Sequence, residues 1–297
     1  MGKLESSLES PMDLDSPPNL VQVESCLWIC EEQLGIPGYD YRFQDFFHCR
    51  HPAFLDQEVT ALARMGAAPD YAFRYERLLE WKVRLVHSPA EYNLTSNLPN
   101  WYPLIKDLTP KSIWYEELPT VAEIESEFTW PVFLKGERQT SKHNRTLSII
   151  EDVVQFREVM EYWKRDPILH WQKVVCRQYI PLRTVAPDNG QALPKAFEFR
   201  TFWWKDRCVG LGPYWNSETY RPNPEEEAEI LRIGQKVSAL MRVTFLVIDI
   251  AQAQNGEWIV IECNDGQDSG YAGISPFRLW QEIVSTIQGY SYGNAPQ

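Results

Sequence analysis

Three oxygen-bearing side chains stand within two apolar runs near the C-terminal end of the chain. Asp249 lies in the run FLVIDIA, and Glu262 and Asn264 lie in the run WIVIECNDG. Both runs have the composition of β-strands, and Asn255-Gly256 between them is typical of a hairpin turn. Because side chains alternate along a strand, Glu262 and Asn264 project to one face, which Asp249 can reach from the partner strand. Two carboxylates and an amide oxygen form the hard ligand set that Mg²⁺ prefers.

The same three residues are also compatible with a polar patch at a sheet edge, in which the protein itself satisfies each group. Two neighbouring carboxylates in apolar surroundings repel each other and are costly to bury without a partner. A bound cation removes this conflict. We therefore favour a metal site over a polar patch.

Three further features place positive charge or backbone groups at the ends of apolar runs. Lys135-Gly136 ends the run PVFLK, where a lysine can reach phosphate oxygens and a glycine lets the backbone approach. Arg200 lies inside FEFRTF and needs an anionic partner, either a structural carboxylate or a phosphate. The run VVCRQYIPL ends at a proline, which leaves backbone groups for the edge of an adenine. Taken alone, Lys135 is more simply a solvated lysine at a strand end.

The elements that would position these groups alternate between strands and helices. Strands are predicted at 83–87, 112–115, 131–135, 147–150, 174–180, 197–204, 208–211, 245–251 and 258–263. Helices are predicted at 54–64, from Ser88-Pro89 onward, at 152–165 and from 223 to about 241. The pattern indicates an α+β fold with an antiparallel sheet in the C-terminal half.

Bulk composition excludes some classes of function. The 297 residues carry 29 Lys plus Arg against 41 Asp plus Glu, a net charge of −12, which disfavours broad binding to nucleic acid. No apolar run is long enough to cross a bilayer, and the first residues lack the apolar core of a signal peptide. We expect a cytoplasmic protein with no membrane or nucleic-acid partner and with reduced thiols. Residues 1–18, which are polar and rich in Ser and Pro, are expected to form a flexible tail.

Cysteine and histidine residues gather between positions 26 and 51. Their spacing fits no strong zinc-binding pattern. We interpret Cys26 and Cys30, which flank Leu27, Trp28 and Ile29, as small apolar side chains in a buried segment.

In their order along the chain, these features resemble the ATP-grasp superfamily over about residues 80–280. That family has a strand with a phosphate-binding lysine, a lid loop, a hinge strand that pairs with adenine, an arginine strand, and a hairpin of the form D-[IV]-A … [IV]-[IV]-E-x-N-x-G. The corresponding parts are Lys135, the loop 137–144, the strand 176–180, Glu198-Phe199-Arg200, and Asp249 with 262–266. The hairpin is the specific element. The segments HSPAEY, DLTP and NDGQDSGY look like a bacterial branch of ATP-grasp proteins.

The resemblance implies an α+β ATP-grasp fold with an N-terminal α/β domain. It divides the chain into the tail at 1–18, an N-terminal α/β domain at 19–120 and the ATP-grasp lobes at 121–290. It also implies that the protein binds ATP and Mg²⁺. By this resemblance the nucleotide-binding residues are Lys135, Gln178, Tyr179, Ile180, Glu198 and Arg200, and the metal ligands are Asp249, Glu262 and Asn264.

The chemistry that the resemblance implies is phosphoryl transfer from ATP to a carboxylate, followed by attack of an amine on the acyl phosphate. Arg200 would stabilise the group in transfer. The lid has a single glycine, so its contact with phosphate would depend on Arg138, Lys142 or His143. A second ATP-binding lysine would be Lys106 or Lys111, and neither aligns securely.

The loop after the metal ligands is the expected contact with the substrate. Its candidate residues are Asp265, Gln267, Asp268 and Ser269. Either aspartate is able to bind or deprotonate an amine, and either is also a common turn-capping residue. The carboxylate and the amine themselves are not identified by the sequence.

An alternative belongs to another class of protein. Some ATP-grasp proteins, including chaperones that assemble a eukaryotic translation initiation factor, bind ATP and act on a protein partner, and the FEFRTF strand resembles theirs. The NDGQDSG segment favours a ligase. A catalytically inactive binding module is disfavoured by the intact set of Asp249, Glu262 and Asn264.

Overall fold

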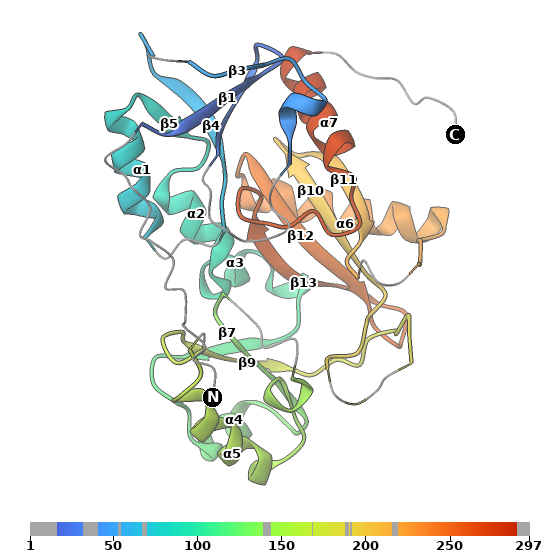
Figure 1. Cartoon of the computed structure of the whole chain (residues 1–297). Helices are drawn as coiled ribbons and strands as arrows, with labels where there is room; N and C mark the ends of the chain where they lie inside the picture. Colours follow the sequence, from blue (N-terminus) through green and yellow to red (C-terminus); the bar gives the residue numbers. More distant parts are fainter. Residues whose placement is uncertain are drawn as a thin grey trace, which may run out of the picture.

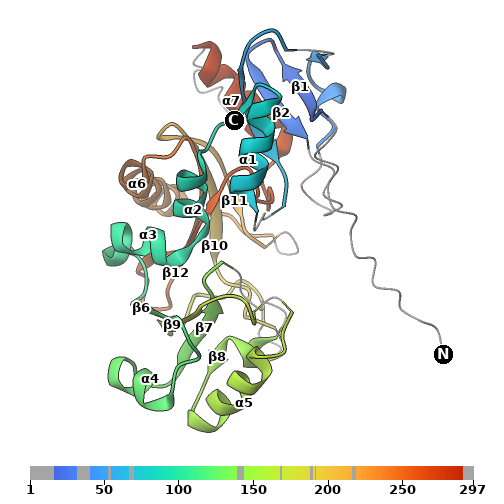
Figure 2. The ribbon, with the colours of Figure 1, turned by 90° about the vertical axis from the view of Figure 1, so that its left-hand side faces the viewer.

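The computed structural model describes residues 17–31, 41–52, 55–66, 70–138, 144–167, 169–187, 190, 192–215 and 219–289. Within these residues the strands form three sheets, of five, four and four strands. The N-terminal sheet and the sheet that carries α4 and α5 lie at opposite ends of the molecule, and the third sheet lies between them (Figures 1 and 2). This arrangement gives the middle sheet a neighbour at each end.

The N-terminal sheet has the strand order β3-β1-β2-β4-β5. Its strands are β1 (Asn19–Val23), β2 (Leu27–Glu31), β3 (Cys49–Arg50), β4 (Val59–Arg64) and β5 (Val83–Leu85). Helices α1 (Tyr71–Glu80) and α2 (Pro89–Ser96) accompany it, and a 3₁₀ turn spans Phe43–Asp45. Ser88 caps α2 through a capping box, which confirms the helix start predicted at that residue.

Strand β4 corrects the prediction of a helix at 54–64. The part of that segment from Val59 onward pairs in parallel with β2 on one side and with β5 on the other. A central parallel strand is covered on both faces, so its apolar residues follow one another without alternation. The spacing of Val59 and Leu62 is therefore equally typical of a helix and of such a strand, and periodicity does not separate them. Phe54 lies outside the described residues.

The second sheet has the order β6-β9-β7-β8, with antiparallel neighbours throughout. Its strands are β6 (Ser112–Tyr115), β7 (Val132–Gly136), β8 (Ile149–Ile150) and β9 (Val174–Gln178), and its helices are α4 (Val121–Glu127) and α5 (Val153–Trp163). A 3₁₀ turn at Arg145–Leu147 precedes β8. β6 lies before the domain boundary that the sequence predicts at residue 120, yet it pairs with β9 of this sheet.

The middle sheet is antiparallel and has the order β11-β10-β12-β13. Its strands are β10 (Glu198–Trp204), β11 (Arg207–Pro213), β12 (Phe245–Gln252) and β13 (Trp258–Asp265), which confirms both predicted hairpins. Helices α3 (Leu98–Ile105) and α6 (Pro224–Met241) pack against one face, and a 3₁₀ turn at Lys106–Leu108 follows α3. The other face packs against α7 (Pro276–Gln288) and the N-terminal sheet. Among the described helices, none combines the length and apolar composition that crossing a membrane requires.

The packing of α6 against the middle sheet predicts an unusual effect of alanine at Gly234. A Cβ at this position would lie 2.3 Å from Cζ2 of Trp203, whose buried indole donates a hydrogen bond to Thr201 Oγ1 at 2.8 Å. Alanine normally stabilises a helix by about 1 kcal/mol relative to glycine. Here we expect overpacking to reverse the sign, so that Gly234→Ala lowers the free energy of unfolding by about 1–3 kcal/mol in a urea melt. The exposed neighbour change Gln235→Ala is the control, and equal stability of the two variants would contradict the prediction.

Candidate active site

A cavity of about 440 Å³ lies between the second sheet and the middle sheet. Such a volume is in the range of small-molecule sites. Six residues predicted as nucleotide or metal contacts line it: Lys135, Gln178, Tyr179, Ile180, Glu198 and Glu262. They come from β7, β9, the segment after β9, β10 and β13, so the two sheets build the wall together.

The wall combines apolar surface with charge. Apolar and aromatic lining residues include Phe133, Ile149, Leu182, Tyr214, Trp215, Ile259 and Ile261. The segment after β9 crosses from one sheet to the other, because Leu182 forms a bridge with Ala253 beyond the end of β12. The backbone N–H of Gln178 already donates to Lys111 O at 2.8 Å. A flat apolar ligand beside this segment would therefore meet the backbone of Tyr179 and Ile180.

Lys135 and Glu262 form an ion pair that joins β7 of the second sheet to β13 of the middle sheet. The side chain of Lys135 is 3% exposed, so the lysine is not the solvated strand-end residue of the simpler interpretation. Asn264 donates from Nδ2 to Oε2 of Glu262 at 3.3 Å. Glu262 thus has a cation on one oxygen and an amide on the other.

Arg200 and Asp249 lie directly opposite each other on β10 and β12. Arg200 Nε donates to Asp249 Oδ1 at 2.8 Å and Nη2 donates to Oδ2 at 2.7 Å, so the pair is bidentate. Nη1 donates to Gly270 O at 2.9 Å, and the guanidinium lies 5.0 Å from the ring centre of Tyr214. Of the two partners that the sequence leaves open for Arg200, the structure has the structural carboxylate.

The predicted metal ligands occupy neighbouring positions. Asp249 is opposite Glu262 in the register of β12 and β13, and Val247 is opposite Asn264. The repulsion between carboxylates that we expect from the sequence does not arise, because Arg200 neutralises Asp249 and Lys135 neutralises Glu262.

The donor set still fits a hard cation, because each carboxylate oxygen keeps a lone pair beside its existing hydrogen bond. No group of three or more His, Cys, Asp or Glu side chains suited to a metal occurs in the described part of the chain. A cation here would therefore draw on two carboxylates, the amide oxygen of Asn264 and oxygens of a bound phosphate.

Two arginines on the cavity wall are absent from the sequence prediction. Arg145 lines the cavity from the turn after the lid loop. Arg177 donates to Ser112 Oγ at 3.0 Å, to Thr109 Oγ1 at 2.6 Å and to Ile261 O at 2.8 Å, so it ties β9 to β13. Burial lowers the pKa of Arg177 to about 10. The signal that points to Arg177 is the one that points to Arg200, a guanidinium inside an apolar strand.

The lysines considered for phosphate contact fall in different places. Lys142 and His143 of the predicted lid lie outside the described residues. Lys111 bonds through Nζ to Glu127 Oε2 at 2.9 Å, with both side chains nearly half exposed. Lys106 is exposed in the turn after α3. Lys135 is the lysine that the described structure places on the cavity wall.

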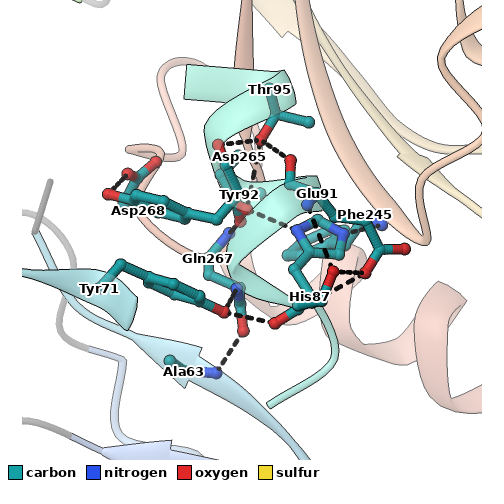
Figure 3. Close-up of polar contacts among 12 residues, drawn as sticks. Ala63, Tyr71, His87, Glu91, Tyr92, Thr95, Phe245, Asp265, Gln267 and Asp268 are labelled. Carbon is teal, nitrogen blue, oxygen red and sulfur yellow. Dashed lines mark hydrogen bonds and ion pairs between the residues drawn. The ribbon is translucent and has the colours of Figure 1, made fainter. Parts of the chain in front are cut away.

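The predicted substrate loop is mostly buried against the N-terminal sheet (Figure 3). Asp265 Oδ2 accepts from His87 Nδ1 at 2.5 Å, and its Oδ1 accepts from the backbone N–H of Gln267 at 2.8 Å. Because His87 Nε2 accepts from Phe245 N–H at 3.0 Å, the ring proton belongs on Nδ1. This network holds the end of β13, next to Asn264.

Gln267 and Ser269 also find their partners inside the protein. Gln267 accepts from Ala63 N–H at 2.9 Å and donates to Tyr71 Oη at 3.1 Å. Ser269 Oγ donates to Asp265 O at 2.6 Å. Asp265, Gln267 and Ser269 are therefore supports of the loop rather than residues of the cavity wall, which corrects the predicted substrate contact for these three.

Asp268 differs from its neighbours because its side chain stays partly accessible. Tyr92 of α2 donates a hydrogen bond to Asp268 Oδ2 at 2.9 Å (Figure 3). Burial, and after it the charge of Asp265, raises the pKa of Asp268 to about 7. Of the four predicted substrate contacts, Asp268 alone retains the accessibility that contact with a ligand requires.

The raised pKa of Asp268 predicts how stability depends on pH. Between the ordinary aspartate pKa of about 4 and the folded-state value, the folded protein binds a proton that the unfolded chain has lost, so this group lowers stability as pH rises. We expect Asp268→Asn to gain free energy of unfolding over the wild type progressively from pH 4 to pH 7, with a constant difference above pH 8. Denaturant melts of both proteins across this range measure the difference. Parallel curves would show that the carboxyl group is already ionised at low pH.

Comparisons with known proteins agree with this geometry. Residues 105–283 match the model of an ATP-grasp domain, the third family of its clade. No curated protein matches the sequence. Among solved structures, the chain is similar to VanG D-Ala:D-Ser ligase from Enterococcus faecalis, with a TM-score of 0.56, 13% identity, and coverage of 77% of this chain and 72% of that one.

Two further solved structures show the same fold. D-alanine–D-alanine ligase from Bacillus anthracis, complexed with ATP, has a TM-score of 0.56 and 14% identity, and the match covers 77% of this chain and 79% of that one. A RimK domain protein ATP-grasp from Sphaerobacter thermophilus DSM 20745 has a TM-score of 0.53 and 15% identity, with coverage of 79% and 81%. The family match extends over more than half of the chain, and the chain therefore belongs to this family of ATP-grasp domains.

Proposed function

We propose that the protein is a ligase that uses ATP and Mg²⁺ to activate a carboxylate as an acyl phosphate and then joins it to an amine. The observation that carries this proposal is the cavity wall, where Lys135, the segment 178–180 and Glu262 meet between two sheets in an ATP-grasp fold. The similar structures named as D-Ala:D-Ser and D-alanine–D-alanine ligases support a ligase rather than a binding module.

The wall divides the work of binding ATP. The backbone of Tyr179 and Ile180 lies beside the apolar lining and suits an adenine edge, which needs both a donor and an acceptor. Lys135 and Arg145 carry the positive charge that suits the phosphates. Arg200 acts through Asp249, because its guanidinium is committed to that carboxylate and holds it in place. We thus propose Arg200 as a positioning residue rather than as the direct phosphate contact implied by the resemblance.

Asp249, Glu262 and Asn264 are the residues that would hold Mg²⁺. A magnesium ion neutralises phosphate charge during phosphoryl transfer. Lys135 and Arg200 keep the two carboxylates apart and correctly oriented before the cation arrives. Because Glu262 contacts both Lys135 and Asn264, its position is fixed from two strands.

The proposed reaction proceeds in two steps. An oxygen of the substrate carboxylate attacks the γ-phosphorus of ATP, the bond to the β-phosphate oxygen breaks, and ADP leaves. The nitrogen of the amine then attacks the acyl carbon, the amine loses a proton, and inorganic phosphate leaves. The protein contributes position and charge rather than a covalent intermediate of its own.

Two measurements test the proposal. Mg·ATP should raise the melting temperature, since a ligand that binds only the folded state stabilises it, by about 2.7 kcal/mol at a concentration of ~100 times its Kd. ADP release should then depend on a carboxylate from a screened panel, and hydroxylamine should trap the acyl phosphate as a hydroxamate. Absence of any nucleotide binding would overturn the proposal. Nucleotide binding without carboxylate-dependent ADP release would favour a module that acts on a protein partner.

A further inference from the structure

Arg138 and Asp268 share a neighbour but do not bind each other. Arg138 follows β7, Asp268 follows β13, and Tyr92 lies on α2. Tyr92 donates to Asp268 Oδ2 at 2.9 Å, and the guanidinium carbon of Arg138 is 5.5 Å from the centre of the Tyr92 ring. A cation and an anion are thus held beside one aromatic side chain, whose own ring stacks on Tyr71 with 3.9 Å between centres.

Both charges are incompletely satisfied within the described residues. Nη2 of Arg138 is buried and has no hydrogen-bond partner there. Arg138 and Arg64 favour the ionised form of Asp268, yet burial outweighs them and raises its pKa to about 7. A buried donor without an acceptor and a buried carboxylate without a close cation are both costly. A ligand that supplies one acceptor and one cation would remove both costs.

The position of this pair suits a substrate. Arg138 is three residues beyond Lys135, and Asp268 is six residues beyond Glu262. Lys135 and Glu262 bind each other, so the two segments start side by side at the cavity wall. Three extended residues span about 10 Å, which places Arg138 within that distance of the lysine assigned to phosphate.

We propose that Arg138 and Asp268 bind the two ends of a zwitterionic α-amino acid, which serves as the amine substrate. Arg138 binds its carboxylate, Asp268 binds its ammonium group, and Tyr92 orients Asp268. An inorganic anion would face Asp268, and a simple amine would leave Arg138 without an acceptor, so the pair selects a molecule that has both groups. The assignment of the amino acid as a substrate rests on the proposed ligase function.

The test measures binding rather than turnover. The full-length protein is titrated, with and without Mg·AMPPNP, with the twenty proteinogenic L-α-amino acids and D-alanine, and the melting temperature is recorded. Each compound that binds is compared with its decarboxylated amine and its deaminated acid. We expect at least one α-amino acid to raise the melting temperature, and both analogues to bind at least ~10-fold more weakly, because each leaves one charge unpaired.

Two variants separate the two ends of the ligand. Asp268→Asn should remove the preference for the amino acid over its deaminated acid, and Arg138→Gln should remove the preference over its decarboxylated amine. The exposed changes Asp107→Asn and Arg157→Gln are the matched controls. Retention of both preferences in the two variants would overturn the assignment.

The nucleotide titration separates this inference from the proposed function. If AMPPNP binds but no amino acid does, the amino-acid site is wrong and the ligase proposal stands. If an amino acid binds as expected while no nucleotide does, the site is correct and the ligase function fails. If Arg138→Gln weakens AMPPNP but not ADP, Arg138 contacts the γ-phosphate and the assignment is overturned.

Discussion

Replacement of Arg200 by alanine is expected to lower the free energy of unfolding by about 3–5 kcal/mol, because it leaves a buried carboxylate without its cation. Asp249 is 1% exposed and receives two hydrogen bonds from Arg200, at 2.8 and 2.7 Å. The same change should reduce ATP turnover, since Asp249 loses the contact that orients it toward Glu262. Urea melts and ADP release measure the two effects.

A double-mutant cycle distinguishes a true ion pair from general damage to the sheet. Replacing both members of a buried pair by apolar residues is often close to neutral for stability. The double variant Arg200→Met/Asp249→Leu should therefore be more stable than Arg200→Ala or Asp249→Ala alone. If the losses of the single variants simply add, the pair contributes no coupling and the expected role of Arg200 is wrong.

Replacement of Lys135 by methionine is expected to weaken Mg·ATP binding by ~10–100-fold. Hydrogen bonds to charged groups contribute about 1.5–3 kcal/mol, and about 1.4 kcal/mol corresponds to a factor of ten in affinity. Because Lys135 is 3% exposed and pairs with Glu262, the variant should also lose about 1–3 kcal/mol of stability. Calorimetric titration with Mg·AMPPNP and denaturant melts without nucleotide measure these two quantities.

Lys173 provides the matched control for Lys135. It lies next to β9, and its side chain is 34% exposed and pairs with Glu116. Lys173→Met should leave AMPPNP affinity within about twofold of the wild type, since an exposed ion pair contributes little. Equal affinities of the two variants would remove Lys135 from the phosphate site.

The elements with local signals were predictable from the sequence. The capping boxes at Ser88 and Asn223 fix the starts of α2 and α6, because each depends on a residue three positions later. The hairpin of β12 and β13 follows from alternation and from Asn255-Gly256. Alternation also predicts that Glu262 and Asn264 share a face, since it depends only on neighbours along one strand.

The partners of the charged residues were not predictable, because they lie far apart in the sequence. Lys135 and Glu262 are 127 positions apart, and His87 and Asp265 are 178 apart. A motif names polar residues without stating which are satisfied inside the protein. Asp265 and Asp268 look alike in the sequence, and only the packing of the N-terminal sheet separates a buried support from an accessible carboxyl group.

The seam between the N-terminal sheet and the loop after β13 constrains how this chain can evolve. Residues 105–283 carry the family match, yet Asp265 and Gln267 depend on His87, Ala63 and Tyr71, which precede that segment. The segment is therefore not a cassette that recombination can attach to a different N-terminal domain without loss. A new neighbour would have to supply a donor for the carboxylate and both partners for the amide, so the two sides of the seam must diverge together.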